Sequence, residues 1–372
     1  MPLARGQVEN CSLRAARGGV AATAVALAAV GALLAFAPDE RPAASPPGPV
    51  PLAAAWPGAQ RADIAGNLDD GPVFNPGVFL DARTGVGTAP TPDGTAVRLL
   101  VRNPDGSVRE LRRRSLQSNP EFGNLTVGGD DLAWTESADG VPLQIWTART
   151  TGGPARRVTT DTGNALFFGS QWDLVIAGGE VHWAAAAPEG EKVTEVRSVA
   201  LAGGAVRRRE EPGIWALSAW PWLAENGGED RSGTARLRDL AANRDLRVET
   251  AGAELATCGP VWCRVLVMIG DGPAGIDVMH PDGSARRRIA GGGTSAAIAD
   301  VAVLDRFEIL SEPEPDSDLT GNAGLLIFDI ATGRTVGVGA AVNGAFSRNG
   351  VLWWATGDQD SLTWHTVDLR TV

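Results

Sequence analysis

Apolar and polar positions between Asn124 and Thr160 alternate in a way that predicts four short β-strands. The strands are rich in β-branched and aromatic residues and lie at Leu125–Val127, Leu132–Glu136, Leu143–Arg149 and Ala155–Thr159. Gly-Gly-Asp-Asp, Ala-Asp-Gly and Thr-Gly-Gly separate them, and these residues favour tight turns over helices. The stretch therefore predicts a four-stranded antiparallel meander.

This meander recurs along the chain. The turn between its third and fourth strands returns at Asp105-Gly106, Gly152-Gly153, Gly203-Gly204, Asn243-Arg244, Asp282-Gly283 and Thr332-Gly333. The spacing is roughly 40 to 50 residues with no helical pattern between the turns, which is typical of β-propeller blades. Third strands follow this spacing from Val97–Arg102 to Leu362–Leu369. The sequence predicts an all-β fold, a seven-bladed β-propeller, with six or eight blades as the open alternatives.

The last predicted blade is incomplete. Its third strand ends at Leu369 and only three residues follow, so it has no outer strand of its own. An unpaired outer edge invites aggregation, and a segment from the other end of the chain is placed to cover it. We expect Gln60–Leu68 to supply this strand, pairing antiparallel with Leu362–Leu369.

Three Pro-Asp-Gly elements carry a family resemblance. Thr91–Thr95 (TPDGT), Asn103–Ser107 (NPDGS) and His280–Ser284 (HPDGS) resemble the turn signatures of TolB-like, WD-repeat-type bacterial propellers. Phe79–Leu100 and Cys258–Arg264 (CGPVWCR), together with the N-terminal segment, resemble membrane-anchored propellers of high-GC Gram-positive bacteria. The resemblance implies extracytoplasmic protein binding and brings no catalytic residues.

The N-terminal segment predicts a membrane anchor. Arginines in residues 1–17 precede an uncharged apolar run at 18–37, which as a helix is long enough to cross a hydrocarbon core of about 30 Å. The positive-inside bias then places 1–17 in the cytoplasm and the propeller, 60–372, outside the cell membrane. A cleaved signal peptide, which would give a secreted protein, is the alternative, although Pro38 after Ala37 disfavours cleavage. Residues 38–59 are rich in Pro and Ala and predict an extended linker.

Charge and cysteine content narrow the function. The formal net charge of −11 argues against nucleic-acid binding, since phosphate neutralisation requires positive charge. Cys258 and Cys263 bracket a Gly-Pro turn between two strand-like runs, so we expect a disulfide across that hairpin. Cys11 falls in the predicted cytoplasmic tail.

No motif predicts catalysis or a metal. His182, His280 and His365 lie in different predicted blades, and no carboxylate or cysteine sits at ligand spacing beside them in the sequence. The stretch Asp316–Asn322 resembles the start of a calcium loop but lacks the acid at its twelfth position, so we interpret it as an ordinary polar loop. Nucleophile-elbow and phosphate-loop motifs are incomplete. We expect no cofactor.

Tryptophan is the one unusual aromatic signal. The chain has 12 Trp and no Tyr, and Trp215, Trp220 and Trp222 cluster within Ile214–Asp230. Core packing between blades is the favoured interpretation, and a binding surface on a loop is the alternative. These three are the candidate binding residues.

The sequence favours a function in binding rather than in catalysis. The leading hypothesis is a membrane-anchored scaffold or sensor that binds other cell-envelope proteins and is not an enzyme. The alternatives are a propeller lyase or hydrolase with a site at the channel mouth, and a sensor of a small ligand. The identity of the partner and the oligomeric state stay open.

Overall fold

The computed structural model describes residues 48–188, 192–225, 234–270, 272–358 and 361–372. The chain divides into two compact units, Met1–Gly48 and Pro49–Val372, and the fold below is that of the second. The predicted cytoplasmic tail and membrane anchor lie outside the described residues, so both stay predictions. Within the described ranges, no helix is long and apolar enough to cross a membrane.

The strands of this unit form antiparallel sheets in which successive strands of the chain pair with one another. The first two sheets contain β3 (Asn75–Phe79), β4 (Gly85–Pro90), β5 (Ala96–Arg102) and β6 (Val108–Ser115), then β7 (Glu121–Gly128), β8 (Asp131–Ala138), β9 (Val141–Arg149) and β10 (Arg156–Thr159). The next contains β11 (Asn164–Leu166), β12 (Val175–Ala177), β13 (Glu180–Ala186), β14 (Val193–Ala200) and β15 (Arg207–Pro212). Two more contain β16 (Trp215–Leu217), β17 (Trp222–Glu225), β18 (Thr234–Asp239) and β19 (Arg244–Glu249), then β20 (Glu254–Cys258), β21 (Cys263–Ile269), β22 (Gly272–Met279) and β23 (Arg287–Gly291).

The remaining strands form one eight-stranded sheet. It contains β24 (Ser295–Ala296), β25 (Phe307–Pro313), β26 (Ala323–Asp329), β27 (Arg334–Arg348), β28 (Val351–Thr356), β29 (Thr363–Asp368), β2 (Arg61–Ala65) and β1 (Val50–Pro51). The long strand β27 pairs with β26 through Val342 and with β28 from Asn343 onward. It is therefore the outer strand of one four-stranded group and the inner strand of the next.

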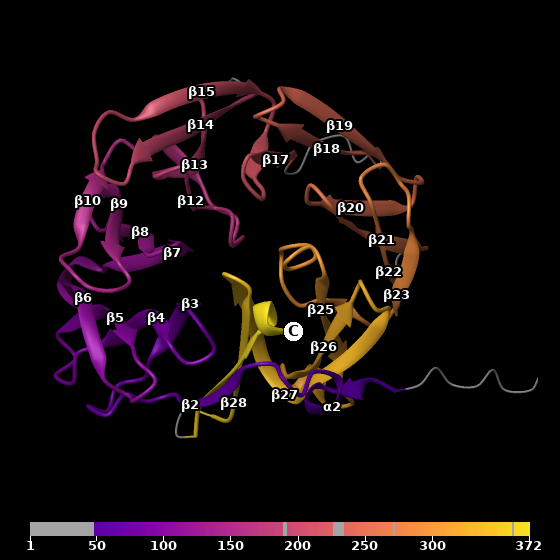
Figure 1. The fold of residues 1–372 in the computed structure, drawn as a ribbon, viewed down its shortest axis with the longest axis horizontal. Helices are drawn as coiled ribbons and strands as arrows, with labels where there is room; N and C mark the ends of the chain where they lie inside the picture. The colour runs from indigo at the N-terminus through magenta and orange to yellow at the C-terminus, as the bar shows by residue number, and fades with distance from the viewer. Residues whose placement is uncertain (1–47, 189–191, 226–233, 271, 359–360) are drawn as a thin grey trace, which may run out of the picture. The chain divides into compact units, whose positions relative to one another are not determined.

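Local turn chemistry explains why these strands are short. In the NPDGS turn between β5 and β6, Gly106 has φ +83°, a conformation that favours glycine, and the Asp105 carboxylate accepts a hydrogen bond from the Ser107 amide at 3.0 Å. Central strands such as β13 are buried on both faces, with five consecutive residues buried, whereas outer strands such as β6 have no buried residue. Burial on both faces is what sheets stacked face to face require. Successive sheets of the unit follow one another around a common centre, as Figure 1 shows.

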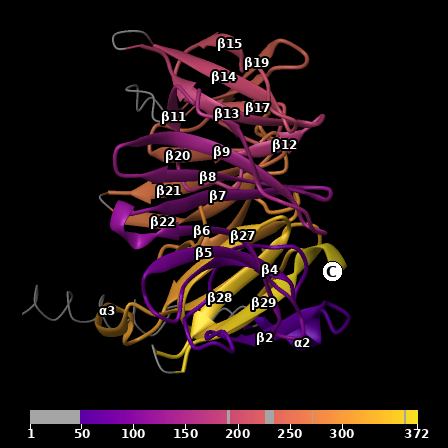
Figure 2. The same cartoon turned by 90° about the vertical axis from the view of Figure 1, so that its left-hand side faces the viewer.

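The predicted clasp is confirmed. Strand β2 pairs antiparallel with β29, with Arg61 opposite Val367 and Ala65 opposite Thr363 (Figure 2). The N-terminal and C-terminal sheets also touch directly, because the Trp364 Nε1 atom donates a hydrogen bond of 2.9 Å to the carbonyl oxygen of Phe74. The clasp strand thus joins two parts of the chain about 300 residues apart in sequence.

The end of the predicted linker has structure of its own. Strand β1 pairs in parallel with β27, and the short helix α2 (Leu52–Ala55) follows it. Leu52 is buried in a cluster that includes Phe307, and the Trp56 ring contacts Phe307 edge-on at 5.4 Å. Apolar burial therefore fixes residues that a Pro/Ala-rich composition predicts as extended spacer. The other short helices are η1 (Leu116–Ser118), α3 (Ser317–Thr320) and η2 (Leu369–Thr371).

Candidate functional site

Loops from four of the sheets converge on a pocket of about 470 Å³, which we call the central pocket. Its lining segments are 168–172 between β11 and β12, 216–219 at the end of β16 and just after it, 257–262 at the end of β20 and in the turn to β21, and 299–305 between β24 and β25. Most of these loops lead from the innermost strand of a sheet to its second strand. Neighbouring sheets of a propeller present such loops at the same end, and this is why distant segments meet here.

Two aspartates hold the segment 168–171 in place. The Ser170 hydroxyl donates a hydrogen bond of 2.5 Å to Asp300 Oδ1, and the Gln171 amide donates one of 3.1 Å to Asp300 Oδ2. Asp173 Oδ2 accepts hydrogen bonds from the amides of Phe168 at 2.8 Å and Gly169 at 2.7 Å. Since Ser170 and Asp300 are 130 residues apart in sequence, Asp300 ties one wall of the pocket to another.

Burial changes the proton affinity of these groups. It raises the pKa of Asp173 and of Asp300, because removing a carboxylate from water disfavours its charged form. It lowers the pKa of Arg348, although the charges of Asp173 and Asp300 act in the opposite direction on that guanidinium. The Arg348 Nη1 atom donates a hydrogen bond of 3.1 Å to the Leu125 carbonyl oxygen. The three groups therefore form one electrostatically coupled cluster behind the pocket.

A buried ion pair supports the segment 299–305. Glu308 is fully buried and pairs with Arg264, which is 9% exposed. The Arg264 Nη2 atom donates a hydrogen bond of 2.6 Å to the carbonyl oxygen of Asp300, and the Ala302 amide donates one of 2.8 Å to Glu308 Oε2. Both partners of the pair thus hold backbone atoms of the pocket wall.

This wall has an uncommon backbone conformation. Ala302, Leu304 and Asp305 have φ of +47°, +56° and +56°, in the left-handed region that non-glycine residues rarely adopt. Such conformations persist only where the surroundings impose them, and they concentrate at functional sites. The Arg264–Glu308 pair restrains the backbone at the first of these positions, since Glu308 accepts the hydrogen bond of the Ala302 amide.

The lining of the central pocket combines acids with apolar rings. Its acidic residues are Glu225, Asp300 and Asp305, and the lining residues that the structure describes include no Arg, Lys or His. Burial raises the pKa of Asp305. Phe168 and Leu304 are exposed at the pocket, and Trp172 and Trp262 also line it. This arrangement suits a ligand with a positive group beside an apolar one.

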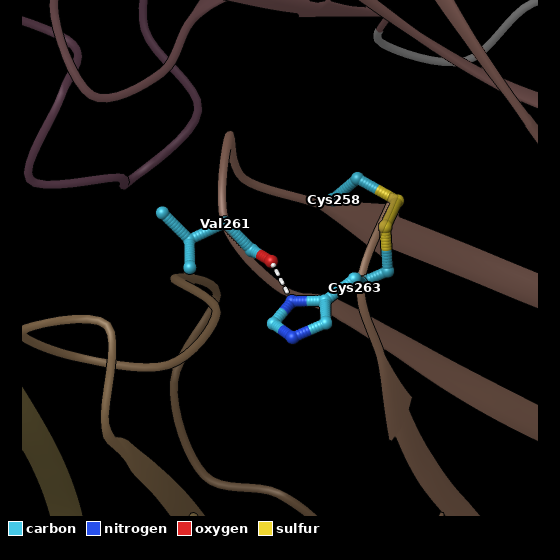
Figure 3. Close-up of a disulfide and its surroundings, with 4 residues drawn as sticks. Cys258, Val261 and Cys263 are labelled. Carbon is cyan, nitrogen blue, oxygen red and sulfur yellow. Dashed lines mark hydrogen bonds between the residues drawn. A yellow bond between two sulfur atoms is a disulfide. The ribbon is translucent and has the colours of Figure 1, made fainter. Parts of the chain in front are cut away.

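The predicted disulfide is confirmed, and it lies beside this pocket. Cys258 and Cys263 are bonded and face each other in register across the β20–β21 hairpin, as Figure 3 shows. The turn that it closes carries Pro260 and Trp262, which line the pocket. The carbonyl oxygen of Val261 in the same turn lies 2.9 Å from Nδ1 of His280, which directly follows β22. The disulfide therefore restrains the turn that positions Trp262.

The three candidate tryptophans lie apart from the central pocket. Trp215 is 1% exposed in an apolar cluster, and its Nε1 atom donates 2.9 Å to the Pro212 carbonyl oxygen. Trp220 stacks on His182 with ring centroids 3.8 Å apart, and Trp222 packs against the cluster around Leu237. A binding role for these three stays a prediction. Sequence reasoning passed over Asp173, Asp300 and Trp172, which meet only in three dimensions.

Among the residues that the structure describes, no group of three or more His, Cys, Asp or Glu is placed to hold a metal ion. The stretch that resembles a calcium loop contains α3, whose C-cap is Gly321 with φ +72°.

No protein-family model matches this chain, and a comparison with curated proteins finds no significant match. Solved structures do match. The propeller domain of the Trilobed protease from Pyrococcus furiosus is similar with a TM-score of 0.46 and 15% identity, over 66% of this chain and 82% of that one. A prolyl endopeptidase matches with a TM-score of 0.50 and 13% identity, over 84% of this chain and 48% of that one. Puromycin hydrolase matches with a TM-score of 0.46 and 13% identity, over 76% of this chain and 50% of that one.

At these identities the likeness to the prolyl endopeptidase shows the fold alone. It confirms the propeller, whereas the TolB-like or WD-repeat type stays a prediction. The match also spans half or less of the length of the prolyl endopeptidase and the puromycin hydrolase.

The comparisons correct the functional hypothesis drawn from the sequence. That hypothesis was a scaffold or sensor for envelope proteins, whereas the solved structure that matches at a TM-score of 0.50 is a prolyl endopeptidase. The expectation rested on a family resemblance read from turn motifs. Those motifs specify the hairpin turns of a propeller. Hairpin turns carry no information about what the propeller binds or whether it takes part in catalysis.

Proposed function

We propose that this chain is the substrate-binding propeller of a hydrolase, and that the central pocket binds a peptide-like substrate through its free amino end. The observation that carries the proposal is the lining of the central pocket, in which carboxylates and exposed apolar side chains share one wall. The propeller fold of hydrolytic enzymes agrees with this role by analogy.

The pocket's charge favours an ammonium group. Asp305 and Glu225 line it, and none of its described lining residues is basic. Arg236 pairs with Glu225 at 3.5 Å, so Asp305 is the carboxylate that carries the proposal. Opposite charge in a partly desolvated pocket strengthens binding beyond its value in bulk water. Phe168, Leu304 and Trp262 lie beside these acids and would contact an apolar side chain that follows the amine.

We also propose that the unit is a seven-bladed ring. The eight-stranded sheet counts as two blades that share β27, and β2 completes the second of them. The first sheet and the last pack against each other, since the Phe79 and Trp353 rings lie 5.4 Å apart. An experimental structure that separated these two sheets would contradict closure.

The test of the ligand compares two forms of one peptide. A tripeptide that begins with Phe, with a free amino end, is titrated against its N-acetylated form, and the fluorescence of Trp172 and Trp262 reports binding. We expect the acetylated form to bind about tenfold more weakly, a difference of about 1.4 kcal/mol. Equal affinities would contradict the ammonium site.

A charge variant tests the residues. Asp305→Asn keeps the side-chain shape, and Asn tolerates the left-handed backbone at this position. It should remove most of the preference for the free amine. Asp318→Asn is the matched control, because Asp318 is exposed on α3 and does not line the pocket. An Asp305→Asn variant that kept the full preference for the free amine would contradict the binding role of this pocket.

A further inference from the structure

A second polar cluster lies on the strands that close the clasp. His365 Nε2 is 2.7 Å from the Thr356 hydroxyl, and His365 Nδ1 is 2.7 Å from Asp63 Oδ1. A hydroxyl, an imidazole and a carboxylate in one hydrogen-bonded chain are the arrangement of an activated nucleophile, its base and the group that orients the base. None of the three residues lines the central pocket.

Strand register explains why these residues meet. Asp63 on β2 and Trp354 on β28 are both directly opposite His365 on β29, so the three side chains share one face of the sheet. Thr356 is two residues beyond Trp354 and therefore lies on that same face. The His365 ring stacks on Trp354 with centroids 5.5 Å apart and planes at 21°. Packing and pairing together fix the orientation of the imidazole.

The contacts also indicate the tautomer. A carboxylate can only accept a hydrogen bond, so Nδ1 carries the proton that it donates to Asp63, and Nε2 is left to accept from the Thr356 hydroxyl. The other two histidines are placed differently. His182 Nε2 lies 3.1 Å from the Ala177 carbonyl oxygen, and His280 Nδ1 lies 2.9 Å from the Val261 carbonyl oxygen.

A large cavity adjoins this cluster. It measures about 960 Å³ and is lined by Asp63, His365 and Trp354, and we call it the clasp cavity. Its lining also includes three arginines, Arg61, Arg83 and Arg102.

Arg61 and Arg83 are exposed to a negative ligand, whereas Arg102 is buried. In the part of the chain that the structure describes, none of the three forms an ion pair with a carboxylate, whereas Arg98 pairs with Asp70 at 2.7 Å. Arg102 instead donates 2.6 Å to the Ala65 carbonyl oxygen. Arg61 is two residues from Asp63 and lies on the same face of β2. A guanidinium without a protein partner is suited to bind a carboxylate or phosphate of a ligand.

We propose that Thr356, His365 and Asp63 form a catalytic relay that hydrolyses carboxylic esters whose acyl part carries a second, anionic group. Thr356 is the nucleophile, His365 the general base and Asp63 the group that orients it. Arg61 pairs with the anionic group of the substrate. This activity goes beyond the proposed function and does not depend on the central pocket.

The reaction balances with water as the only co-reactant. The Thr356 oxygen attacks the ester carbonyl carbon, and its proton passes to His365 Nε2. The carbon–oxygen bond of the ester breaks, and the departing alcohol takes that proton. Water then attacks the acyl-threonine and gives a proton to Nε2, which returns it to the Thr356 oxygen as the acid leaves.

The experiment combines turnover with covalent labelling of the full chain. The substrates are 4-nitrophenyl hydrogen succinate, which is anionic, and neutral 4-nitrophenyl acetate. We expect faster turnover of the anionic ester, and a fluorophosphonate probe should attach to the peptide that contains Thr356. His365→Gln should lower both turnover and labelling about 100-fold, in the range of lost general-base catalysis.

Matched variants separate chemistry from folding. Thr356→Val removes the hydroxyl while nearly preserving shape and should abolish the label, whereas Thr356→Ser should retain it. Thr363→Val is the control, because Thr363 is the cross-strand partner of Thr356 and its hydroxyl bonds to the Ser361 carbonyl oxygen. Arg61→Gln should remove the preference for the anionic ester only. Thermal melting verifies that each variant is folded, and folded wild-type protein that carries no label at Thr356 would overturn the proposal.

Discussion

The central pocket and the clasp cavity carry opposite charge on one scaffold. The central pocket is lined by three carboxylates and no basic residue, whereas the clasp cavity has three arginines, one histidine and the single carboxylate of Asp63. The first is built from loops at one end of the inner strands. The second is lined by strand residues of β2, β28 and β29, by α2, and by Arg83 and the turn after β5. The chain as a whole has a net charge of −11, so the positive lining of the clasp cavity has the opposite sign to the charge of the protein.

Their supports also differ. The wall of the central pocket rests on the buried Arg264–Glu308 pair and on the tie between Ser170 and Asp300. The clasp cavity depends on pairing between β2 and β29. The contrast shows that one propeller can hold loops in place by buried charge and hold side chains in place by strand register.

Removing the clasp should have the largest effect. Deletion of Met1–Gly48 retains Leu52 and Trp56, which pack against the core around Phe307, so this variant should stay soluble and folded. Deletion of Met1–Leu68 also removes β2 and exposes the edge of β29. We expect its melting temperature to fall by about 10 °C or more, or the protein to aggregate. Calorimetry measures the melting temperature and light scattering measures aggregation. Equal stability of the two deletion variants would show that β2 does not clasp the fold.

Breaking the buried pair behind the central pocket should have the next largest effect. Glu308→Ala leaves the Arg264 guanidinium buried without its partner, which typically costs about 3 to 5 kcal/mol of stability. The control is Asp130→Ala, which breaks an exposed pair with Arg149 and should cost less than about 1 kcal/mol. Urea unfolding gives both values. Similar losses in the two variants would mean that the pair contributes no more than a surface contact.

The smallest effect is a pH dependence in the central pocket. Burial raises the pKa of Asp300 in the folded protein, so its contribution to stability is present below its unfolded pKa and is lost as pH rises through the raised value. Asp300→Asn stays neutral at every pH. The melting temperature of this variant, relative to that of the wild type, should therefore be higher at pH about 7 than at pH about 4.

Asp161 provides the opposite control for this prediction. Hydrogen bonds from Arg208 and Arg197 lower its pKa, so its contribution is present at neutral pH and is lost on acidification. The melting temperature of Asp161→Asn, relative to that of the wild type, should thus be lower at pH about 7 than at pH about 4. Parallel trends in the Asp300 and Asp161 variants would contradict both pKa shifts.

Features encoded within a few residues could be predicted from the sequence. The Gly and Asp turns define the strands, and a short Gly-Pro hairpin was enough to pair Cys258 with Cys263. The clasp could also be predicted, because a blade with three strands requires a fourth. The structure of Val50–Ala55 could not, since its composition is that of a spacer and only tertiary burial of Leu52 fixes it.

Contacts between distant residues were beyond such reasoning. Asp63 and His365 are 302 residues apart, and the search for histidine partners considered only residues nearby in sequence. One signal was available, however. Aligning the ends of the predicted clasp segments places Asp63 opposite Thr366 or Val367, so the prediction brought Asp63 to within two residues of His365 without fixing the observed register. No comparable rule joins Ser170 to Asp300, because loop conformations decide that contact.

Strand β27 has a consequence for the dynamics of the fold. It passes from β26 to β28 without a loop, bending near Ala341 and Gly344, where φ is +51° and +73°. Two neighbouring four-stranded groups therefore share one strand, whose first half pairs in one group and whose second half pairs in the other, with no turn between them. Other sheets are connected by turns that can open separately, but these two must open together, so their amides should exchange with solvent as a single cooperative unit.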